Sequence, residues 1–256
     1  MAILSDRDIK KELGKNIYLS PFHSANLKGG SINLTASKYG WSLETKKSIY
    51  DPQQKALVIP PNGTALIETE EAIYVSQHIG GSYHSKVTLV SKGISHISTT
   101  LDPGWVGSSL IALHNNSSSE VQIPVGSSFV TIIFHYLKSK SSHGNADPPG
   151  RIDILTDFNL TDAERDWLDD DWRKYKNKLK LKMESDEDYK SMKKTTFVTV
   201  KRGIVINISI FIICLASFFF LKEKMTVWGM EVKDYLIPIL VIYLGATSTQ
   251  IAQSLK

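Results

Sequence analysis

The 256-residue sequence contains a single cysteine, Cys214, and it stands inside an apolar run. One thiol excludes a disulfide framework and a cysteine-based zinc site, and it fits a reducing compartment. The opening residues, MAILSDRDIKKELGK, carry acids and lack the basic start and apolar stretch of a secretory signal peptide. We therefore expect the part of the chain before the apolar runs to lie in the cytosol.

Charge is absent from Gly203 to Leu221, GIVINISIFIICLASFFFL. As a helix rising ~1.5 Å per residue, this stretch matches a bilayer core of about 30 Å. A second apolar segment runs from Tyr235 to Leu255 after a polar loop, and the lysines and arginines of Arg173–Arg202 are typical of a cytoplasmic membrane flank. We predict two transmembrane helices, 203–221 and 235–255, in the inner (cytoplasmic) membrane, a multi-pass arrangement with the N-terminal domain and the C-terminus in the cytosol.

The second predicted span carries a polar stripe, because four polar residues recur at helical spacing. In hydrocarbon such a stripe must face another helix or water. It is interpreted either as a pore lining in an oligomer or as interhelical hydrogen bonding, helped by the small residues Gly245 and Ala246. Asn207 in the first span is either a partner of the stripe or an interfacial residue. The stripe comprises Tyr243, Thr247, Gln250 and Ser254.

Residues 1–138 alternate short apolar segments with turn signals such as NG, GG and DPG. Many short strands with little helix predict a mainly β domain, either a barrel or a sandwich. SDRDIKKEL predicts a short helix capped by Ser5. The expected strands are SINLTAS, ALVIPP, TALIETEEAIYVS, KVTLV, SLIALHN, EVQIPV and SFVTIIFHYL.

Residues 139–160 are rich in Ser, Gly, Asn and Pro at their start, which predicts a linker or an arm that reaches a neighbouring subunit. Residues 161–202 predict a charged amphipathic connecting helix, beginning at the capping pattern TDAE. Its apolar stripe needs a partner, either the core domain or the same helix in other subunits. The acids Asp169 to Asp171 are interpreted as a solvated helix face rather than a metal site.

The segment TTLDPGWVGSSLIALHN, Thr99–Asn115, resembles the dCTP deaminase/dUTPase superfamily, which comprises trimeric, β-rich enzymes of deoxynucleotide metabolism. The resemblance covers roughly the first 138 residues and implies a dUTPase-like, dCTP deaminase-like β-barrel. Supporting matches occur in the family's order at Leu4–Ile9, Gly30–Ser37, Ile59–Val75 and Ser85–Ile94.

The same resemblance implies a nucleotide site. Ser85, Lys86 and Thr88 offer hydroxyl, backbone and cationic donors to phosphate oxygens. Asp102 lies where the family places the chain against the deoxyribose and base of a neighbouring subunit's nucleotide, and Asn33 stands at the position of the first motif's aspartate. No metal site or cofactor is predicted, apart from Mg²⁺ accompanying a bound triphosphate. The family further implies a homo-oligomer, specifically a trimer.

Several site positions depart from the family. Where the deaminases carry a glutamate as general base, this chain has Ala112, and alanine cannot move a proton. Thr35 and Lys86 replace arginines, and lysine loses the bidentate fork. His84, His96 and His114 could act as bases, although histidines on strands are more typically packed or solvated. These departures indicate a catalytically inactive domain and therefore no enzyme.

Three hypotheses follow. The first is a membrane effector that binds a nucleotide or short single-stranded oligonucleotide and gates an oligomeric pore. It resembles the nucleotide- or DNA-gated effectors of bacterial anti-phage defence and would take a signal-synthesising enzyme as a partner. The second is a membrane-tethered dCTP deaminase or dUTP diphosphatase, and the third is a structural protein whose domain trimerises the spans.

Overall fold

The computed structural model describes residues 2–195, 207, 209, 212, 226–227, 230–231 and 242–243. They fall into two compact units, Met1–Lys190 and Ser191–Lys256. Among the described residues, no helix combines the length and the hydropathy that crossing a bilayer requires. The spans predicted at 203–221 and 235–255 lie almost wholly outside the described residues, as do the stripe residues Thr247, Gln250 and Ser254.

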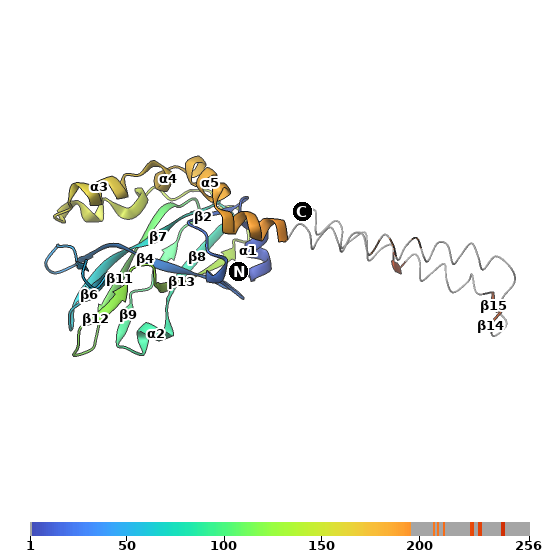
Figure 1. Ribbon diagram of the computed structural model, residues 1–256. Coiled ribbons are helices and arrows are strands. Elements are labelled where there is room, and N and C mark those ends of the chain that lie inside the picture. The colour runs from blue at the N-terminus through green and yellow to red at the C-terminus, as the bar shows by residue number, and fades with distance from the viewer. Residues whose placement is uncertain are drawn as a thin grey trace. The chain divides into compact units, whose positions relative to one another are not determined.

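A ten-stranded antiparallel sheet forms the body of the first unit. The prediction of a mainly β domain is confirmed, although the sheet curls into a half-barrel rather than a closed barrel (Figure 1). Its main path is β10 (Thr100–Leu101), β8 (Ile79–Ser85), β13 (Ser128–Tyr136), β4 (Ser31–Ser42), β7 (Thr64–Val75), β11 (Val106–Asn115) and β9 (Ile94–His96).

Shorter strands complete the sheets. β1 (Ala2–Ile3) pairs with β13, β2 (Ile17–Ser20) with β7, and β3 (Leu27–Lys28) with β4. A three-stranded sheet contains β12 (Val121–Pro124), β6 (Ala56–Ile59) and β5 (Tyr50–Asp51). β12 alternates buried and exposed residues, as a strand with one solvated face should, whereas β7 is buried on both faces. Something must therefore cover the outer face of β7.

Two short α-helices lie in the part of this unit before residue 139. α1 (Asp6–Glu12) begins at a capping box in which the Ser5 side chain accepts from the Asp8 N–H, as expected. KVTLV, predicted as a strand, is instead the short helix α2 (Val87–Val90). Ser85, opposite Val130, is the last residue of β8 that pairs with β13. With no ladder to extend, the chain makes a helical turn whose Val87 is 83% exposed.

The single connecting helix predicted over residues 161–202 is wrong in the part described. The helical region is interrupted at three residues. Asp170 and Asp186 leave helical geometry, and their side chains accept hydrogen bonds from N–H groups at the start of the next helix. The third interruption is at Tyr175, whose backbone is extended. A further helix starts at Glu187. The preceding segments are η2 (Pro149–Arg151), η3 (Ile154–Asp157), α3 (Asp162–Leu168), α4 (Asp171–Lys174) and α5 (Lys176–Ser185), with η1 (Ser24–Asn26) earlier in the chain.

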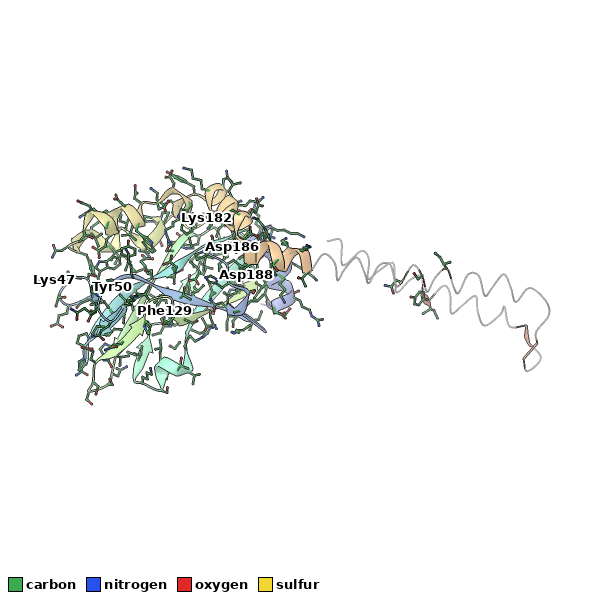
Figure 2. All side chains as sticks on the ribbon, viewed as in Figure 1. Lys47, Tyr50, Phe129, Lys182, Asp186 and Asp188 are labelled. Carbon is green, nitrogen blue, oxygen red and sulfur yellow. The ribbon has the colours of Figure 1, made fainter. Side chains whose placement is uncertain are left out.

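The apolar residues of α3 to α5 pack on the core domain. Of the two partners expected for the apolar stripe, the core domain is therefore the one that it contacts within this chain. α3 to α5 lie over the outer face of the sheet (Figure 1), and Leu168 and Leu179 are buried. At the far end of α5 the Asp186 and Asp188 carboxylates, labelled in Figure 2, accept from the N–H groups of Phe22 and Ser24 at 3.2 and 2.7 Å. We call residues 139–190 the extension.

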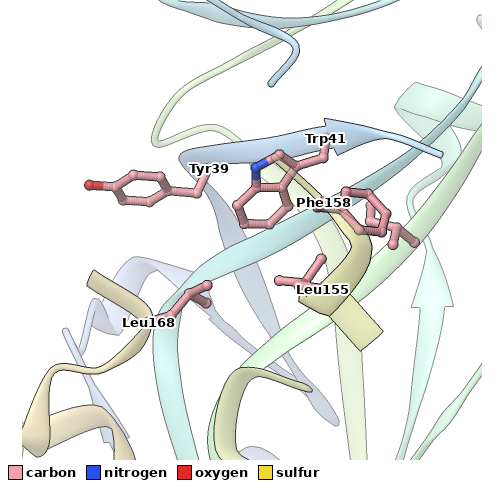
Figure 3. Packing of buried hydrophobic residues seen from close by; sticks show 6 residues of the cluster. Tyr39, Trp41, Leu155, Phe158 and Leu168 are labelled. Atoms are coloured by element: carbon pink, nitrogen blue, oxygen red, sulfur yellow. The ribbon is translucent and has the colours of Figure 1, made fainter. Parts of the chain in front are cut away.

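One buried cluster joins the extension to the sheet. Trp41 of β4 packs with Phe158 and Leu155 (Figure 3). Its Nε1 donates to Glu164 Oε1 at 2.9 Å. Ala112 and Leu110 of β11 pack against the same cluster. The cluster comprises Tyr39, Trp41, Leu66, Leu155, Phe158 and Leu168. The extension is thus part of the fold of the first unit.

Few residues of the second unit are described. β14 (Thr226–Val227) pairs with β15 (Met230–Glu231) in a short hairpin. The Tyr243 hydroxyl donates to Asn207 Oδ1 at 3.4 Å. One stripe residue therefore contacts the asparagine that the sequence offered as its partner.

Candidate functional site

A pocket of about 110 Å³ opens at the DPG turn that precedes β11. Ligand pockets usually measure roughly 300 Å³ or more, so this pocket is smaller than a site for a whole nucleotide normally is. Its walls come from β8, β10, β11 and the extension. The lining residues are Tyr83, Thr99, Thr100, Leu101, Asp102, Trp105, Ser109, Leu110, Asn145, Asp147 and Arg151.

Asp102, predicted as a site residue, lies in this pocket. Its two carboxylate oxygens accept from Thr100 Oγ1 at 3.1 Å and from Asn145 Nδ2 at 3.2 Å. Gly104 has a φ of +85°, and a Cβ there would lie 2.9 Å from Gly144 Cα. The extension thus runs directly over the DPG turn, where only a glycine leaves room for it.

Three pocket residues, Asn145, Asp147 and Arg151, come from the stretch that the sequence indicated as a linker. Arg151 pairs with Asp153 at 2.9 Å and with Asp147 at 3.4 Å. The segment has no hydrophobic period, so pattern analysis could not place it. The alternation of acids around Arg151 was the one available signal.

The floor of the pocket contains a buried hydroxyl pair. Tyr83 and Ser109 approach to 2.5 Å between hydroxyl oxygens. Burial raises the pKa of Tyr83, against the effect of this hydrogen bond, and nearby Glu68 and Asp102 raise it further. The phenol is therefore protonated across the physiological range and can donate a hydrogen bond.

The predicted phosphate-binding residues lie elsewhere on the sheet. Ser85 is the last residue of β8, Lys86 caps α2, and Thr88 lies within α2. Lys86 Nζ donates to Ser128 Oγ at 3.4 Å, and partial burial, with Lys28 nearby, lowers its pKa. The described residues that line the pocket include none of these three.

Asn33 is buried on β4, and its Oδ1 accepts from Thr131 Oγ1 of β13 at 2.8 Å. Thr35, two residues on, donates through its N–H and its hydroxyl to the Glu71 carboxylate, both at 2.9 Å. Burial raises the pKa of Glu71 to about 7 despite these bonds. Asn33 and Thr35 therefore serve internal hydrogen bonds of the sheet.

The Ala112 face of β11 carries a carboxyl that sequence reasoning missed. Leu110 pairs with Glu68 and Ala112 with Leu66, so all four side chains project from one face. Glu68 is fully buried, and neither carboxyl oxygen has a hydrogen-bond partner among the described residues. Burial raises the pKa of Glu68 to about 8, against the opposing charge of Arg173. Its position in TALIETEEAIYV, in phase with buried Leu66, was the available signal.

Arg173 ties the extension to this face. It is 4% exposed, and its Nη1 donates to the Glu70 carbonyl at 2.8 Å and to Ser108 Oγ at 3.0 Å. The guanidinium also lies over the rings of Trp167 and Trp172, 3.9 and 4.2 Å from their centroids. A cation held by two rings and two acceptors fixes α4 against β7 and β11.

Comparison with known proteins identifies relatives of this chain. Residues 3–137 match the family model described as dCTP deaminase-like. The dCTP deaminase of Thermococcus sibiricus is 32% identical over 141 residues, which cover 55% of this chain and 86% of that protein. A solved 2'-deoxycytidine 5'-triphosphate deaminase from Agrobacterium tumefaciens aligns with a TM-score of 0.45 and 11% identity, covering 53% of this chain and 48% of that one. The EIAV dUTPase aligns with a TM-score of 0.35 and 17% identity, covering 56% of this chain and 94% of that one.

These relatives correct one expectation. The absence of a glutamate at Ala112 led us to expect no enzyme, and that expectation is wrong, because proteins matched over most of their own length are named dCTP deaminase. The substitution removes one group at one position. It does not empty the surrounding face of ionisable groups, since Glu68 lies on it.

Proposed function

Because this chain belongs to the dCTP deaminase-like family, we propose that it is an enzyme that hydrolyses the amino group of dCTP to give dUTP and ammonia. The observation that carries this proposal is the pocket built around Asp102 at the DPG turn. It combines an aromatic wall with a carboxylate and a guanidinium. Such a set suits a pyrimidine ring and a sugar hydroxyl.

Different residues of the pocket would contact different parts of the nucleotide. Trp105 and Leu101 supply apolar surface for a ring, and the Asp102 carboxylate accepts from a hydroxyl or an amino group. Arg151 supplies a cation at the rim, although it is paired with Asp153 in the free chain. A ligand phosphate would compete with that carboxylate for the guanidinium.

The small volume supports an oligomer, because a nucleoside triphosphate needs more room than one chain offers. We propose a homo-oligomer in which the Lys86 region of one copy faces the Asp102 pocket of the next. Lys86 is only partly buried, and among the described residues its ammonium donates to the Ser128 hydroxyl at 3.4 Å, so it remains able to bind a phosphate oxygen. The base and sugar would then lie on one chain and the triphosphate on its neighbour.

The test is turnover by the purified full chain. With dCTP we expect dUTP and ammonia in equal amounts, and Asp102→Asn should lower kcat/KM by about 100-fold, about 2.7 kcal/mol of transition-state stabilisation. Asp157→Asn, a change at an exposed aspartate outside the pocket, is the matched control. Failure to release ammonia from dCTP would reject the proposal, and release of dUMP and pyrophosphate would identify a diphosphatase instead.

For the residues after 190 we propose a membrane tether at the predicted spans 203–221 and 235–255, which would hold the enzyme at the inner membrane. The uncharged stretch Gly203–Leu221 supports it. The hydrogen bond from Tyr243 to Asn207 favours helix packing over a pore lining for that member of the stripe.

A further inference from the structure

Glu68 is a buried acid that the fold does not use. Its side chain is 0% exposed, and neither carboxyl oxygen has a hydrogen-bond partner among the described residues. Burying a carboxyl in this way is unfavourable, so such residues are typical of sites where function requires them. The nearby Arg173 gives its hydrogen bonds to Glu70 and Ser108, leaving Glu68 only its electrostatic effect.

The Glu68 carboxyl does not line the Asp102 pocket but lies next to residues that do. Leu110, the cross-strand partner of Glu68, lines that pocket, and so does Arg151 of η2. Gly150, next to Arg151, has a φ of +64°, and a Cβ on it would lie 3.6 Å from Glu68 Oε1. Gly150 thus lies against the Glu68 carboxyl, and the next residue along the chain, Arg151, lines the pocket.

We propose that Glu68 is the proton-transfer residue of this enzyme, delivered to the pocket when the Pro149–Arg151 turn lifts. This proposal rests on the proposed function, deamination of dCTP. Glu68 projects from the same face as Ala112, one cross-strand diagonal away, so a carboxyl is present on the sheet face where alanine offers no proton acceptor.

The chemistry balances with water as the only co-reactant. A water oxygen bonds to C4 of the cytosine ring, Glu68 takes the water's proton, and the electrons of the C4–N3 double bond move to N3, which receives that proton from Glu68. Glu68 then transfers the proton of the new hydroxyl to N4. The C4–N4 bond breaks, ammonia leaves, C4 becomes a carbonyl, and Glu68 returns to its starting state.

The surroundings of the carboxyl keep it neutral in the closed fold. The Arg173 guanidinium of α4 and the Tyr83 phenol of β8 interact with it electrostatically. Apolar Leu110 of β11 is its cross-strand partner, and Leu168 of α3 lies beside the same glycine, Gly150, as the carboxyl does. With the turn closed, burial holds the pKa of Glu68 at about 8. Lifting the turn admits water, which favours the carboxylate that the first step needs.

The test compares Glu68→Gln with the wild-type full chain in an ammonia-release assay with dCTP. We expect kcat to fall at least 100-fold, KM to stay within about threefold, and Glu68→Asp to recover part of the rate. The acid limb of the wild-type pH profile of kcat should be absent from the residual activity of Glu68→Gln. Glu44→Gln, at an exposed glutamate that does not line the pocket, is the control.

The outcomes separate the two proposals. If the wild type releases ammonia and Glu68→Gln does so at a similar rate, the proton-transfer role is wrong and the deaminase proposal stands. If Glu68→Gln loses rate together with dCTP affinity or folded structure, Glu68 is a structural residue and the role is again overturned. If the wild type releases no ammonia, the proposed function falls, and the role of Glu68 falls with it.

Discussion

Raising the pH should destabilise the Met1–Lys190 unit through Glu68, and Glu68→Gln should remove that part of the dependence. The folded-state pKa of Glu68 is about 8, against an ordinary value of 4.5. Because the folded state holds the proton more tightly than the unfolded chain, the contribution is fully present below about pH 4.5. It is lost progressively as the pH rises from 4.5 through 8.

The magnitude follows from the two pKa values. At about 1.4 kcal/mol per pH unit, the interval from 4.5 to about 8 corresponds to a loss of up to about 5 kcal/mol. Local opening of the extension would expose the carboxyl without unfolding the sheet, so we expect roughly half of that, about 2 to 3 kcal/mol. Glu71, whose pKa is raised to about 7, adds a loss of the same sign in both proteins.

The comparison of wild type with Glu68→Gln therefore isolates Glu68. The amide is neutral at every pH and similar in size, so the two proteins should have nearly equal stability at pH 5. At pH 9 the variant should be the more stable, with a Tm roughly 5 to 10 °C higher. Thermal unfolding of the full chain in detergent, followed by circular dichroism at pH 5, 7 and 9, measures this. A Tm difference that stays constant with pH would refute the reasoning.

Two further predictions concern the attachment of the extension. Arg173→Ala removes a buried cation with two short hydrogen bonds and two ring contacts, and should destabilise the docked α4 and α5 by about 3 kcal/mol. The measurement is the rate of tryptic cleavage between Lys174 and Lys182, which should increase. Unchanged cleavage would contradict the role assigned to this side chain. Trp41→Phe removes the donor to Glu164 Oε1 and should lower the free energy of unfolding by about 1 to 3 kcal/mol, measured by urea unfolding. A loss of stability well below 1 kcal/mol would mean that this hydrogen bond is readily replaced.

The elements that sequence predicts are those whose signal is local. Ser5 and Asp8 form the capping box at the start of α1, and Thr161 and Glu164 do so for α3, because the bonding groups stand three residues apart. The strands follow from alternation and from the turns between them. Asp102 is predicted as a site residue from a motif, and in the structure it lines the pocket at that turn.

The features that sequence missed depend on contacts between distant residues. KVTLV has strand propensity, yet β8 pairs with β13 only as far as Ser85, so the segment had no ladder to join. Arg173 appeared to be one of many basic residues before the apolar runs, and only the fold brings it to Glu70 and Ser108. Residues 139–160 predict a linker or an arm because their start is rich in Ser, Gly, Asn and Pro, and only the fold brings Asn145, Asp147 and Arg151 to the pocket.

Ala112 and Glu68 make physical sense as two parts of one arrangement. Both project from the sheet face that the extension covers, and Ala112 packs against the cluster of Trp41, Leu155 and Leu168. A glutamate at position 112 would need space that these residues occupy, and it would bring a second carboxyl to the face of the first. Two buried acids in contact resist ionisation together, which raises the pKa of at least one of them. A small residue at 112 therefore lets the extension pack closely and adds no further carboxyl beside Glu68.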